Sequence, residues 1–462
     1  MKQSSLILIF TLLLKADIGF EEWQHQENQA FVAYQTQMDR AFIEMLKREW
    51  KEYQSNQVFI PYHKPKPHQQ PTVQPKPKPQ ESVKVTTYTP TITPSPTVPQ
   101  KEDIAGFTKV KFNFFGIDIE IRYNNRLKSI RIRGFSPTIS NISIANFWNR
   151  QSSCNYQTVI DEIKEYQNIY SLDGWATYLL VKRLSEEVTT KSDIQNLVQW
   201  FILVKLGIDA KVGFSSNNIN LLIYSNQKIY VSKYFIVDGK RYYSFNNQTS
   251  GLQIYKENMQ GLYAIEFLNQ QIKLPYSIKN REVKITYHQK EYIFNIAYNQ
   301  KLIDFYKTYP QLNYNRYSQF STLSQSSIHQ QLQPIIRDMN KIEAINFLLR
   351  FTQNGFNYKR DIENFGKEKV LFFEETLAYN YSDCEDRAIF FAILVRELLH
   401  LDMVFIKYPN HLATAIQLNS DIKGEKIVYK NRKYYIADPT YTNADIGQAM
   451  PQLKGQKIKI IE

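Results

Sequence analysis

Apolar and polar residues follow one another along the chain in patterns that predict both strands and helices. Residues 107–123 and 275–297 carry apolar side chains at alternate positions, which is typical of hairpins of strands. Residues 156–187 and 335–356 have patterns typical of helices. From residue 389 to 399 the chain is apolar on nearly every face, which predicts a helix buried in a core. We therefore expect an α+β fold with a central buried helix against antiparallel strands.

The first hundred residues have patterns typical of an export signal, an amphipathic helix and a linker. A short basic start and the apolar stretch Leu6 to Leu14 predict an export signal over residues 1–19, too short to cross a bilayer. Apolar residues then recur every 11 residues across 20–55, which places them on one stripe of an amphipathic helix. Eleven of the 18 prolines follow between Pro61 and Pro99. Residues 56–103 are therefore predicted to be an extended, semi-rigid linker.

Composition narrows the classes of function. A chain of 462 residues is long enough for several domains, and its two cysteines exclude a scaffold built from disulfides. We expect Cys154 to be a free thiol. The net charge of +13 suggests anionic surroundings such as lipid or a cell-wall polymer, or serves only to keep the protein soluble. Without a nucleic-acid motif in an exported chain, we do not expect nucleic acid as a partner.

The candidate chemistry lies near the C-terminus. Cys384 stands at the start of the predicted buried helix, His411 follows 27 residues later, and Asp438 follows after another 27. A cysteine in the first turn of a helix is favoured as a thiolate by the unpaired N–H groups there. The histidine opens a predicted strand at 412–416, and the aspartate ends another at 433–437. Together they could supply a nucleophile, a base and an acid that orients the base.

Three short motifs around these residues resemble the transglutaminase-like cysteine enzymes, which are relatives of papain. The matching stretches are Ser382-Asp383-Cys384-Glu385-Asp386-Arg387-Ala388, Tyr408-Pro409-Asn410-His411-Leu412-Ala413 and Tyr435-Ile436-Ala437-Asp438-Pro439-Thr440-Tyr441. The resemblance covers about residues 340–462, and it is nearest to secreted bacterial members of the Bacteroidetes type. It implies a papain-like fold in which Cys384 attacks an amide, and water or an amine then releases the acyl group.

The motifs give less information about the hydrogen-bond donors that would stabilise the oxyanion formed when Cys384 attacks an amide. The backbone N–H of Cys384 is the first expected donor, because it lies at a helix start. The resemblance implies a second donor upstream, and Asn380 or Tyr381 is the candidate.

The acidic neighbours of the cysteine need an explanation, since unpaired carboxylates oppose a thiolate. Asp383, Glu385 and Asp386 form this cluster. One of them could cap the helix, and another could pair with Arg387 or Arg396. Because some relatives with a similar motif are calcium-dependent proteases, the resemblance also allows a calcium site, although the spacing is not that of a calcium loop. Otherwise no cofactor is expected.

An internal repeat is the second feature of the sequence. Residues 192–247 resemble residues 382–441 in their helix, strand and Tyr-Tyr segments. The positions that correspond to the cysteine, histidine and aspartate hold Ile194, Asn220 and Asn246, none of which can act as nucleophile or base. The alternative is a chance likeness between two helix-and-hairpin units in a chain rich in Ile, Asn and Tyr. We expect a degenerate first copy and an intact second copy.

The predicted function is that of an exported thiol-dependent amide hydrolase, a cysteine peptidase or amidase, or of a protein transamidase. Its substrate would be a protein or peptide, and a cell-envelope component is a further candidate partner. An uncleaved signal would tether the protein to the membrane. The alternatives are a non-catalytic envelope scaffold, or a structural role for each of the three residues. The expected organisation is a signal peptide (1–19), an amphipathic helix (20–55), a Pro/Lys-rich linker (56–103), a β-rich segment (104–154), a degenerate domain (155–250), a hairpin segment and linker (251–325) and a catalytic domain (326–462).

Overall fold

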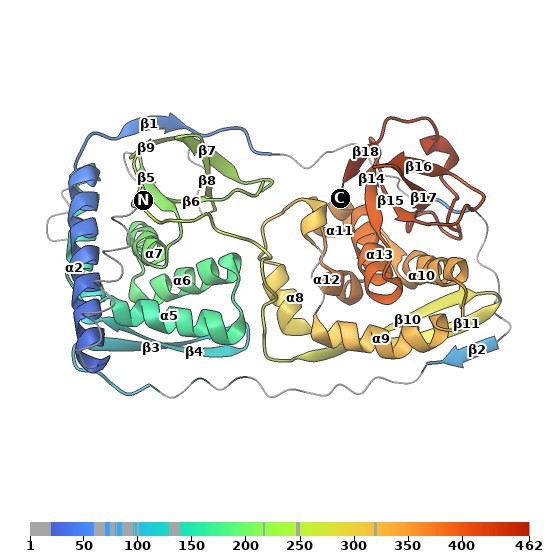
Figure 1. Cartoon of the computed structure of the whole chain (residues 1–462), viewed down its shortest axis with the longest axis horizontal. Coiled ribbons are helices and arrows are strands. Elements are labelled where there is room, and N and C mark those ends of the chain that lie inside the picture. Colours follow the sequence, from blue (N-terminus) through green and yellow to red (C-terminus); the bar gives the residue numbers. More distant parts are fainter. Residues whose placement is uncertain are drawn as a thin grey trace, which may run out of the picture.

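The fold is described from a computed structural model, and it consists of two lobes that lie side by side (Figure 1). The signal expected at 1–19 and Asn246 lie outside the residues that it describes. The described residues are 20–59, 70–73, 79, 81–85, 96, 98, 101–128, 139–215, 218–245, 250–317 and 321–461. We call residues 20–55 and 101–274 the first lobe and residues 275–461 the second lobe.

The first lobe combines a helical layer with an antiparallel sheet of order β1-β9-β5-β6-β8-β7. Helix α7 packs against β5 and β6, and its apolar residues are buried in the core. Its elements are α2 (Phe20–Leu46), β1 (Lys51–Gln54), β3 (Phe107–Phe114), β4 (Ile117–Asn124), α3 (Asn125–Lys128), α4 (Asn141–Ser152), α5 (Gln157–Tyr170), α6 (Gly174–Val188), α7 (Ser192–Lys205), β5 (Ala210–Phe214), β6 (Ile219–Tyr224), β7 (Lys233–Val237), β8 (Lys240–Ser244) and β9 (Gly251–Ile254).

The second lobe has the same mixed α+β character, with an antiparallel sheet of order β16-β17-β15-β14-β18. Helix α13 is the buried helix predicted from the sequence, and it packs against β15 and β14. The elements of this lobe are β10 (Ile278–Tyr287), β11 (Lys290–Asn299), α8 (Gln300–Tyr306), η1 (Tyr314–Arg316), α9 (Thr322–Ile336), α10 (Lys341–Gly355), β12 (Asn357–Tyr358), α11 (Asp361–Phe365), α12 (Phe373–Ala378), β13 (Tyr381–Ser382), α13 (Cys384–Leu399), β14 (Met403–Lys407), β15 (Leu412–Gln417), β16 (Lys426–Tyr429), β17 (Arg432–Ala437), η2 (Pro451–Leu453) and β18 (Lys459–Ile461).

Both predicted hairpins are present, as β3–β4 and β10–β11. The segment expected to be β-rich continues, however, into α4, whose apolar face is buried. The stretch between the predicted strands 412–416 and 433–437 contains an additional strand, β16. Residues 430 and 431 form the tight turn from β16 into β17 and both have positive φ.

The two sheets share one strand order. In the first lobe β5-β6-β8-β7 follow α7, and in the second β14-β15-β17-β16 follow α13 in the same sequence of neighbours. The registers match, since Phe214 lies opposite Ile219 and Lys407 lies opposite Leu412. The residue before β6, at the place that His411 has before β15, is therefore the exposed Asn218. This corrects the alignment from sequence spacing, which assigned Asn220 to that place.

Helix α2 is shorter than the amphipathic segment predicted for residues 20–55. It ends at Leu46, and Tyr53 lies in β1, which pairs with β9. The stripe is buried at Phe42 and Met45, whereas Tyr34 is 57% exposed. The partner for the C-terminal half of the stripe is thus the first lobe itself. None of the described helices is both long enough and apolar enough to cross a membrane.

Described residues of the Pro/Lys-rich segment contact both lobes, and we call those between 56 and 98 the strap; its strand β2 lies beside β11 (Figure 1). Asn56 pairs with a residue of β7 in the first lobe, and β2 (Glu81–Lys84) then pairs in parallel with β11 of the second lobe. The strap returns to the first lobe, where the Tyr170 hydroxyl donates a hydrogen bond to the Pro96 carbonyl at 3.0 Å. The strap thus makes hydrogen bonds with both lobes.

Between these contacts the strap meets the loop that follows β17. Thr442 N–H donates to the Pro71 carbonyl at 2.8 Å, and Val73 N–H donates to the Thr442 carbonyl at 2.9 Å. The side chain of Gln70 donates to the carbonyl of Gln353 at 3.1 Å. The strap therefore holds the loop that begins at Asp438.

Substituting Val73 with proline is expected to lower the free energy of unfolding by about 1–2 kcal/mol, because proline has no N–H to donate to Thr442. The midpoint of urea denaturation measures this. Val73→Ala keeps the N–H and trims a side chain that is already 36% exposed, so it serves as the control. Equal losses in both variants would show that the hydrogen bond contributes nothing.

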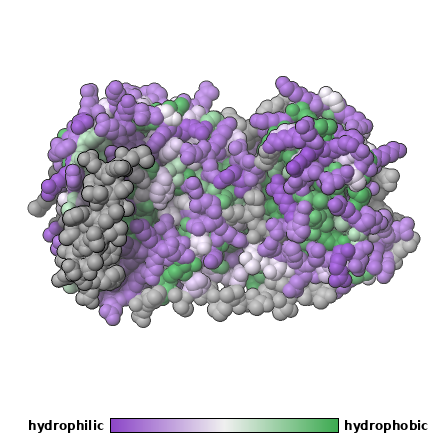
Figure 2. Space-filling view, in the orientation of Figure 1, coloured by the Kyte–Doolittle hydropathy of each residue, from purple (hydrophilic) through white to green (hydrophobic). Residues whose placement is uncertain are grey.

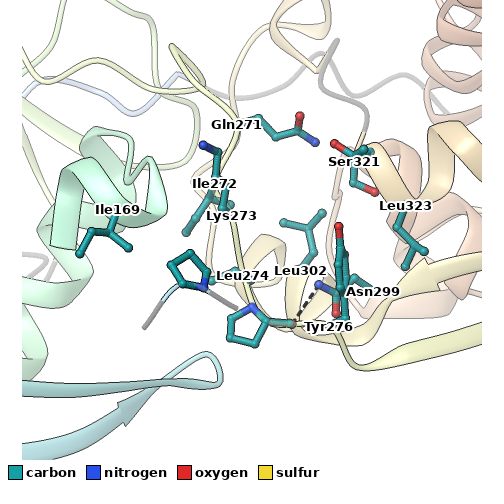
Figure 3. A pocket seen from close by; sticks show the side chains of 13 residues that line it. Ile169, Gln271, Ile272, Lys273, Leu274, Tyr276, Asn299, Leu302, Ser321 and Leu323 are labelled. Atoms are coloured by element: carbon teal, nitrogen blue, oxygen red, sulfur yellow. Dashed lines mark hydrogen bonds between the residues drawn. The ribbon is translucent and has the colours of Figure 1, made fainter. Parts of the chain in front are cut away.

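A pocket of about 470 Å³ lies where the two lobes meet (Figure 3). Ile169 of α5 comes from the first lobe, and Leu302 of α8 and Leu323 of α9 come from the second. Two of the lining residues are bonded to each other, since the Asn299 side chain donates to the Pro275 carbonyl at 3.1 Å. Hydrophilic residues cover most of the visible outer face of both lobes, with apolar residues exposed in small groups between them (Figure 2).

Candidate active site

Cys384 is the first residue of α13, as the sequence pattern predicts. Asp383 caps this helix, and its side chain accepts a hydrogen bond from Glu385 N–H at 3.3 Å. The Asp386 carboxylate in turn accepts one from Asp383 N–H at 3.1 Å, which completes a reciprocal capping box. The helix start is therefore specified by the acidic residues that flank the cysteine.

The buried carboxylates of Asp383 and Asp386 have further support. The second oxygen of Asp386 accepts a hydrogen bond from Leu371 N–H at 2.8 Å. Arg387 lies fully buried beside them and donates to the carbonyls of Gln353 and Phe356 at 3.2 and 2.7 Å. Burial lowers the pKa of Arg387 to about 10, against the opposing pull of nearby anions, so the guanidinium stays charged at neutral pH. Two of the three acids are thus used to build the helix start.

The third acid, Glu385, contacts the candidate nucleophile Cys384. The Cys384 Sγ–H donates to Glu385 Oε2 at 2.8 Å, and the cysteine side chain is 1% exposed. A carboxylate that accepts from a thiol favours the protonated form of that thiol. The Cys384 side chain thus has a carboxylate as its immediate neighbour at the helix start.

His411 and Asp438 meet because the strands beside them are paired. His411 immediately precedes β15 and Asp438 immediately follows β17, and these antiparallel strands place Thr414 opposite Ala437. His411 Nε2 lies 2.8 Å from Asp438 Oδ2, and both side chains are buried. The other aspartate oxygen accepts from Thr440 N–H at 3.0 Å, which fixes the carboxylate in place.

The remaining ring nitrogen of His411 faces the interior. Nδ1 is buried and has no hydrogen-bond partner among the described residues. With Nε2–H donating to Asp438, the neutral tautomer leaves Nδ1 as a proton acceptor. The Tyr408 ring stacks at 6.3 Å from the imidazole. Burial, and then the Asp438 carboxylate, raise the pKa of Tyr408 to about 12, so its hydroxyl is neutral.

The packing of α13 on β15 brings the cysteine helix to the strand that the histidine opens. The thiol–imidazole hydrogen bond is not formed in this state, because Sγ donates to Glu385 and His411 Nδ1 accepts nothing. Formation of that bond requires the cysteine side chain to exchange one acceptor for the other. Of the three predicted residues, His411 and Asp438 are therefore in contact, whereas Cys384 is hydrogen-bonded to the adjacent Glu385.

The two side chains predicted as oxyanion donors are engaged elsewhere. Asn380 Oδ1 accepts a hydrogen bond from Arg281 of β10 at 2.7 Å in an exposed pair. Tyr381 is 36% exposed, and the ammonium of Lys359 lies 5.1 Å from its ring centre. The backbone N–H of Cys384 remains the donor best placed by the fold, because it belongs to the first residue of a helix.

Gln353 is a supporting residue that the sequence did not indicate. It lies near the end of α10, is 1% exposed, and its amide donates to the carbonyls of Asp438 and Ala444 at 3.0 and 3.1 Å. Its side-chain oxygen accepts from Asn443 N–H at 3.0 Å. Because Arg387 binds its backbone carbonyl, Gln353 ties the Asp438 loop to the cysteine helix. A buried glutamine on an apolar helix face is the only local signal for this role.

A group of buried carboxylates could in principle attract a metal ion. Ligand oxygens of Asp361, Asp383 and Asp386 lie within 4.8 Å of one another. Calcium takes six to eight oxygen ligands, and this group supplies three carboxylates. Their oxygens already accept backbone N–H groups, including those of Lys369 and Leu371. The group therefore fits a capping network better than a calcium site.

The other cysteine is distant in sequence and ordinary in environment. Cys154 is free and partly buried, its thiol donates to the Gln151 carbonyl at 3.0 Å, and burial raises its pKa. It therefore has no part in the candidate site, which consists of Cys384, His411 and Asp438. No protein-family model, no curated protein and no solved structure matches this chain.

Proposed function

We propose that the protein is a thiol-dependent amide hydrolase with Cys384 as nucleophile, His411 as base and Asp438 as the residue that orients the base. The observation that carries this proposal is the buried His411–Asp438 pair at 2.8 Å, which leaves Nδ1 as an unused acceptor on the strand against which the cysteine helix packs. A base held by a carboxylate, with its second nitrogen open, is what thiol activation requires.

The reaction begins when Cys384 turns from Glu385 to His411. Nδ1 takes the thiol proton, and the thiolate attacks the carbonyl carbon of the substrate amide. The Cys384 N–H stabilises the oxyanion of the tetrahedral intermediate. His411 then gives its proton to the leaving nitrogen, the C–N bond breaks, and an acyl-enzyme with a thioester bond remains.

A second acceptor completes the cycle. Water, deprotonated by His411, attacks the thioester and releases a carboxylic acid and the free thiol, which makes the protein a peptidase or amidase. An amine in place of water would make a new amide, and the protein would be a transamidase. We favour water, which is the commoner acceptor in the bacterial relatives that the motifs resemble.

The shared strand order supports a duplication in which the first lobe is a degenerate copy of the second. The papain-like, transglutaminase-like fold that we propose for the second lobe rests on the motifs around Cys384, His411 and Asp438. Both lobes place a buried helix before strands with the same neighbours. In the first lobe Asn218 stands before β6 where His411 stands before β15, so that lobe has no base at this position. The proposal therefore assigns chemistry to the second lobe and a structural role to the first.

A non-catalytic scaffold is the second candidate, and the hydrogen bond from the Cys384 thiol to the Glu385 carboxylate favours it. A thiol that is 1% exposed and held by a carboxylate resembles a structural thiol more than an activated one. In either case we propose export through residues 1–19, with protein or peptide partners in the cell envelope and no role in nucleic-acid binding.

The test is turnover of a mixed peptide-amide library by wild-type protein and Cys384→Ala, with and without a fluorescent primary amine. We expect the wild type to release new carboxylic acids and the variant to release none. Intact mass should show a transient acyl adduct on Cys384. EDTA should leave the rate unchanged, because the carboxylate group is short of calcium ligands. Dominant incorporation of the amine would reassign the protein as a transamidase, and equal inactivity of both forms would favour the scaffold.

A further inference from the structure

A second pocket, of about 530 Å³, lies in the first lobe between the α5–α6 turn and the loop that follows β9. Its volume falls within the range of about 300–1,000 Å³ that small-molecule sites have. One wall consists mainly of residues between 167 and 177, and the other of residues between 263 and 270. The residues that line it all belong to the first lobe, so the pocket is separate from the candidate site at Cys384.

Hydrogen bonds hold the two walls of this pocket together. The buried carboxylate of Asp173 accepts from Ala176 N–H of α6 at 2.8 Å and from Leu268 N–H of the loop at 3.1 Å. Gly174 N–H donates to the Glu266 carbonyl at 3.0 Å. A Cβ at residue 174 would lie 2.3 Å from that carbonyl oxygen, so a larger residue does not fit there. The walls are therefore fixed before any ligand binds, which lowers the entropic cost of binding.

Tyr263 gives the pocket a flat aromatic surface. Its side chain is 55% exposed, although its hydroxyl donates to the Leu206 carbonyl at 2.9 Å. One edge of the ring packs against Gly207, where an added Cβ would lie 2.6 Å from Cε1. The ring is thus held at its hydroxyl and at one edge, while more than half of the side chain stays open to solvent. A fixed and open aromatic ring is suited to packing against the apolar face of a ligand.

The polar side chains of the pocket have donors and acceptors to spare. The Glu266 carboxylate accepts from Asn269 at 3.3 Å through Oε2, and its Oε1 accepts from no described residue. Asn168, in the last turn of α5, is exposed, and its amide makes no hydrogen bond with a described residue. The Gln167 amide donates to Thr177 Oγ1 at 2.9 Å, which leaves its oxygen as an acceptor. The pocket therefore offers both kinds of hydrogen-bonding group to a ligand.

The charges of the lining residues narrow the class of ligand. Asp173 and Glu266 are acidic, and none of the described residues that line the pocket is basic. Such a lining repels phosphates and other anions. A wholly apolar ligand would leave the amide and carboxylate groups without partners. A sugar ring fits both constraints, because its hydroxyl groups donate as well as accept and its C–H face is apolar.

We propose that this pocket binds a neutral sugar residue of a glycan, with the C–H face of the sugar ring packed on Tyr263. The sugar hydroxyl groups donate to the Glu266 carboxylate and the Gln167 oxygen, and they exchange hydrogen bonds with the Asn168 amide. The first lobe then has a binding function that needs no catalytic residue. The inference goes beyond the proposed thiol chemistry and does not depend on it, because the two sites share no lining residue.

Saturation-transfer NMR on the full chain tests the sugar site. The probes are neutral disaccharides with different ring stereochemistry: maltose, cellobiose, lactose, mannobiose and N,N′-diacetylchitobiose. We expect at least one of them to bind with a Kd on the order of 0.1–1 mM, with the strongest transfer to the C–H protons of one ring face. The uronic-acid form of that sugar should bind about tenfold more weakly, because its carboxylate meets the Glu266 carboxylate.

Substitutions assign the binding to the pocket. Tyr263→Ala should weaken it by about tenfold, whereas Tyr263→Phe keeps the ring and should retain most of the affinity. Glu266→Gln should weaken the neutral sugar about three- to tenfold and should remove the preference over the uronic-acid form. Tyr34→Ala is the control, because Tyr34 is a similarly exposed tyrosine, at 57%, on α2 outside the pocket.

The outcomes separate this inference from the proposed function. If none of the neutral sugars binds, or if Tyr263→Ala and Glu266→Gln bind as strongly as wild type, the sugar site is wrong. Tighter binding of the uronic-acid form than of the neutral sugar would also contradict it. Cys384→Ala should bind the sugar as wild type does. A protein that binds the sugar but cleaves no amide would keep this site and lose the proposed function.

Discussion

Replacing His411 with alanine should slow alkylation of Cys384 by iodoacetamide at pH 6.5 by roughly 10- to 100-fold. In the proposed enzyme, His411 Nδ1 accepts the thiol proton and the resulting imidazolium holds the thiolate, so the cysteine reacts well below pH 8. Without the imidazole the thiol ionises as a free cysteine does, and about 1% is thiolate at pH 6.5. Rates between pH 5 and 9, measured with Cys154→Ser as background, give the profile.

Two further variants sharpen this result. Asp438→Asn keeps the shape of the pair but removes the charge that stabilises the imidazolium, so its reactivity should lie between wild type and His411→Ala. His329→Ala in α9 removes another histidine of the same lobe and should leave the profile unchanged. If wild type, His411→Ala and His329→Ala share one ordinary thiol profile, the scaffold alternative is the better account.

The exchange of Cys384 between Glu385 and His411 can be followed in the same assay. Glu385→Gln removes the anion that accepts from the thiol at 2.8 Å and leaves a side chain of similar size. We expect its reactivity at low pH to rise above that of wild type, because the carboxylate no longer favours the protonated thiol. Unchanged reactivity would mean that the Glu385 contact does not hold the resting state.

Replacing Arg387 with methionine should lower the free energy of unfolding by about 3–5 kcal/mol. The guanidinium is fully buried and donates to Ser382 Oγ and to the carbonyls of Gln353 and Phe356. Methionine fills part of the space but leaves these acceptors without a donor. It also removes the cation beside the carboxylates that cap α13. The midpoint and slope of urea denaturation measure the loss.

The same helix supplies the control. Arg396 lies near the end of α13, is only partly buried, and donates to the Met403 carbonyl at 3.4 Å. Arg396→Met should therefore cost about 1 kcal/mol or less. Arg387→Lys keeps the charge but not the fork of donors, so it should recover part of the stability. Equal small losses for Arg387→Met and Arg396→Met would contradict the structural role assigned to Arg387.

Much of the candidate site could be predicted because its signals are local. The apolar run after Cys384 and the capping aspartate define where α13 begins, and short apolar segments define β15 and β17. Such patterns depend on helical and strand periodicity within a few residues. The proximity of His411 and Asp438 followed from pairing two strands that are close in the sequence.

The residue of the first lobe that corresponds to His411 could not be predicted from local sequence patterns. A shift of two residues along a strand keeps each side chain on the same face, so the apolar pattern of β6 could not distinguish Asn218 from Asn220. Only the hydrogen-bonded register with β5 decided between them. The extent of α2 is a similar case, because its end depends on the availability of β9 as a partner for β1.

By itself, the sequence determined the α+β class, the position of Cys384 at a helix start and the pairing of a histidine with an aspartate, because these features arise within short stretches of chain. The tertiary structure alone decided that Glu385 holds the thiol, that Gln353 joins the Asp438 loop to α13, and that the strap binds both lobes. Each of these side chains could form the same kind of hydrogen bond with many other groups in the chain. Which partner it has depends on how the elements pack together in the folded protein.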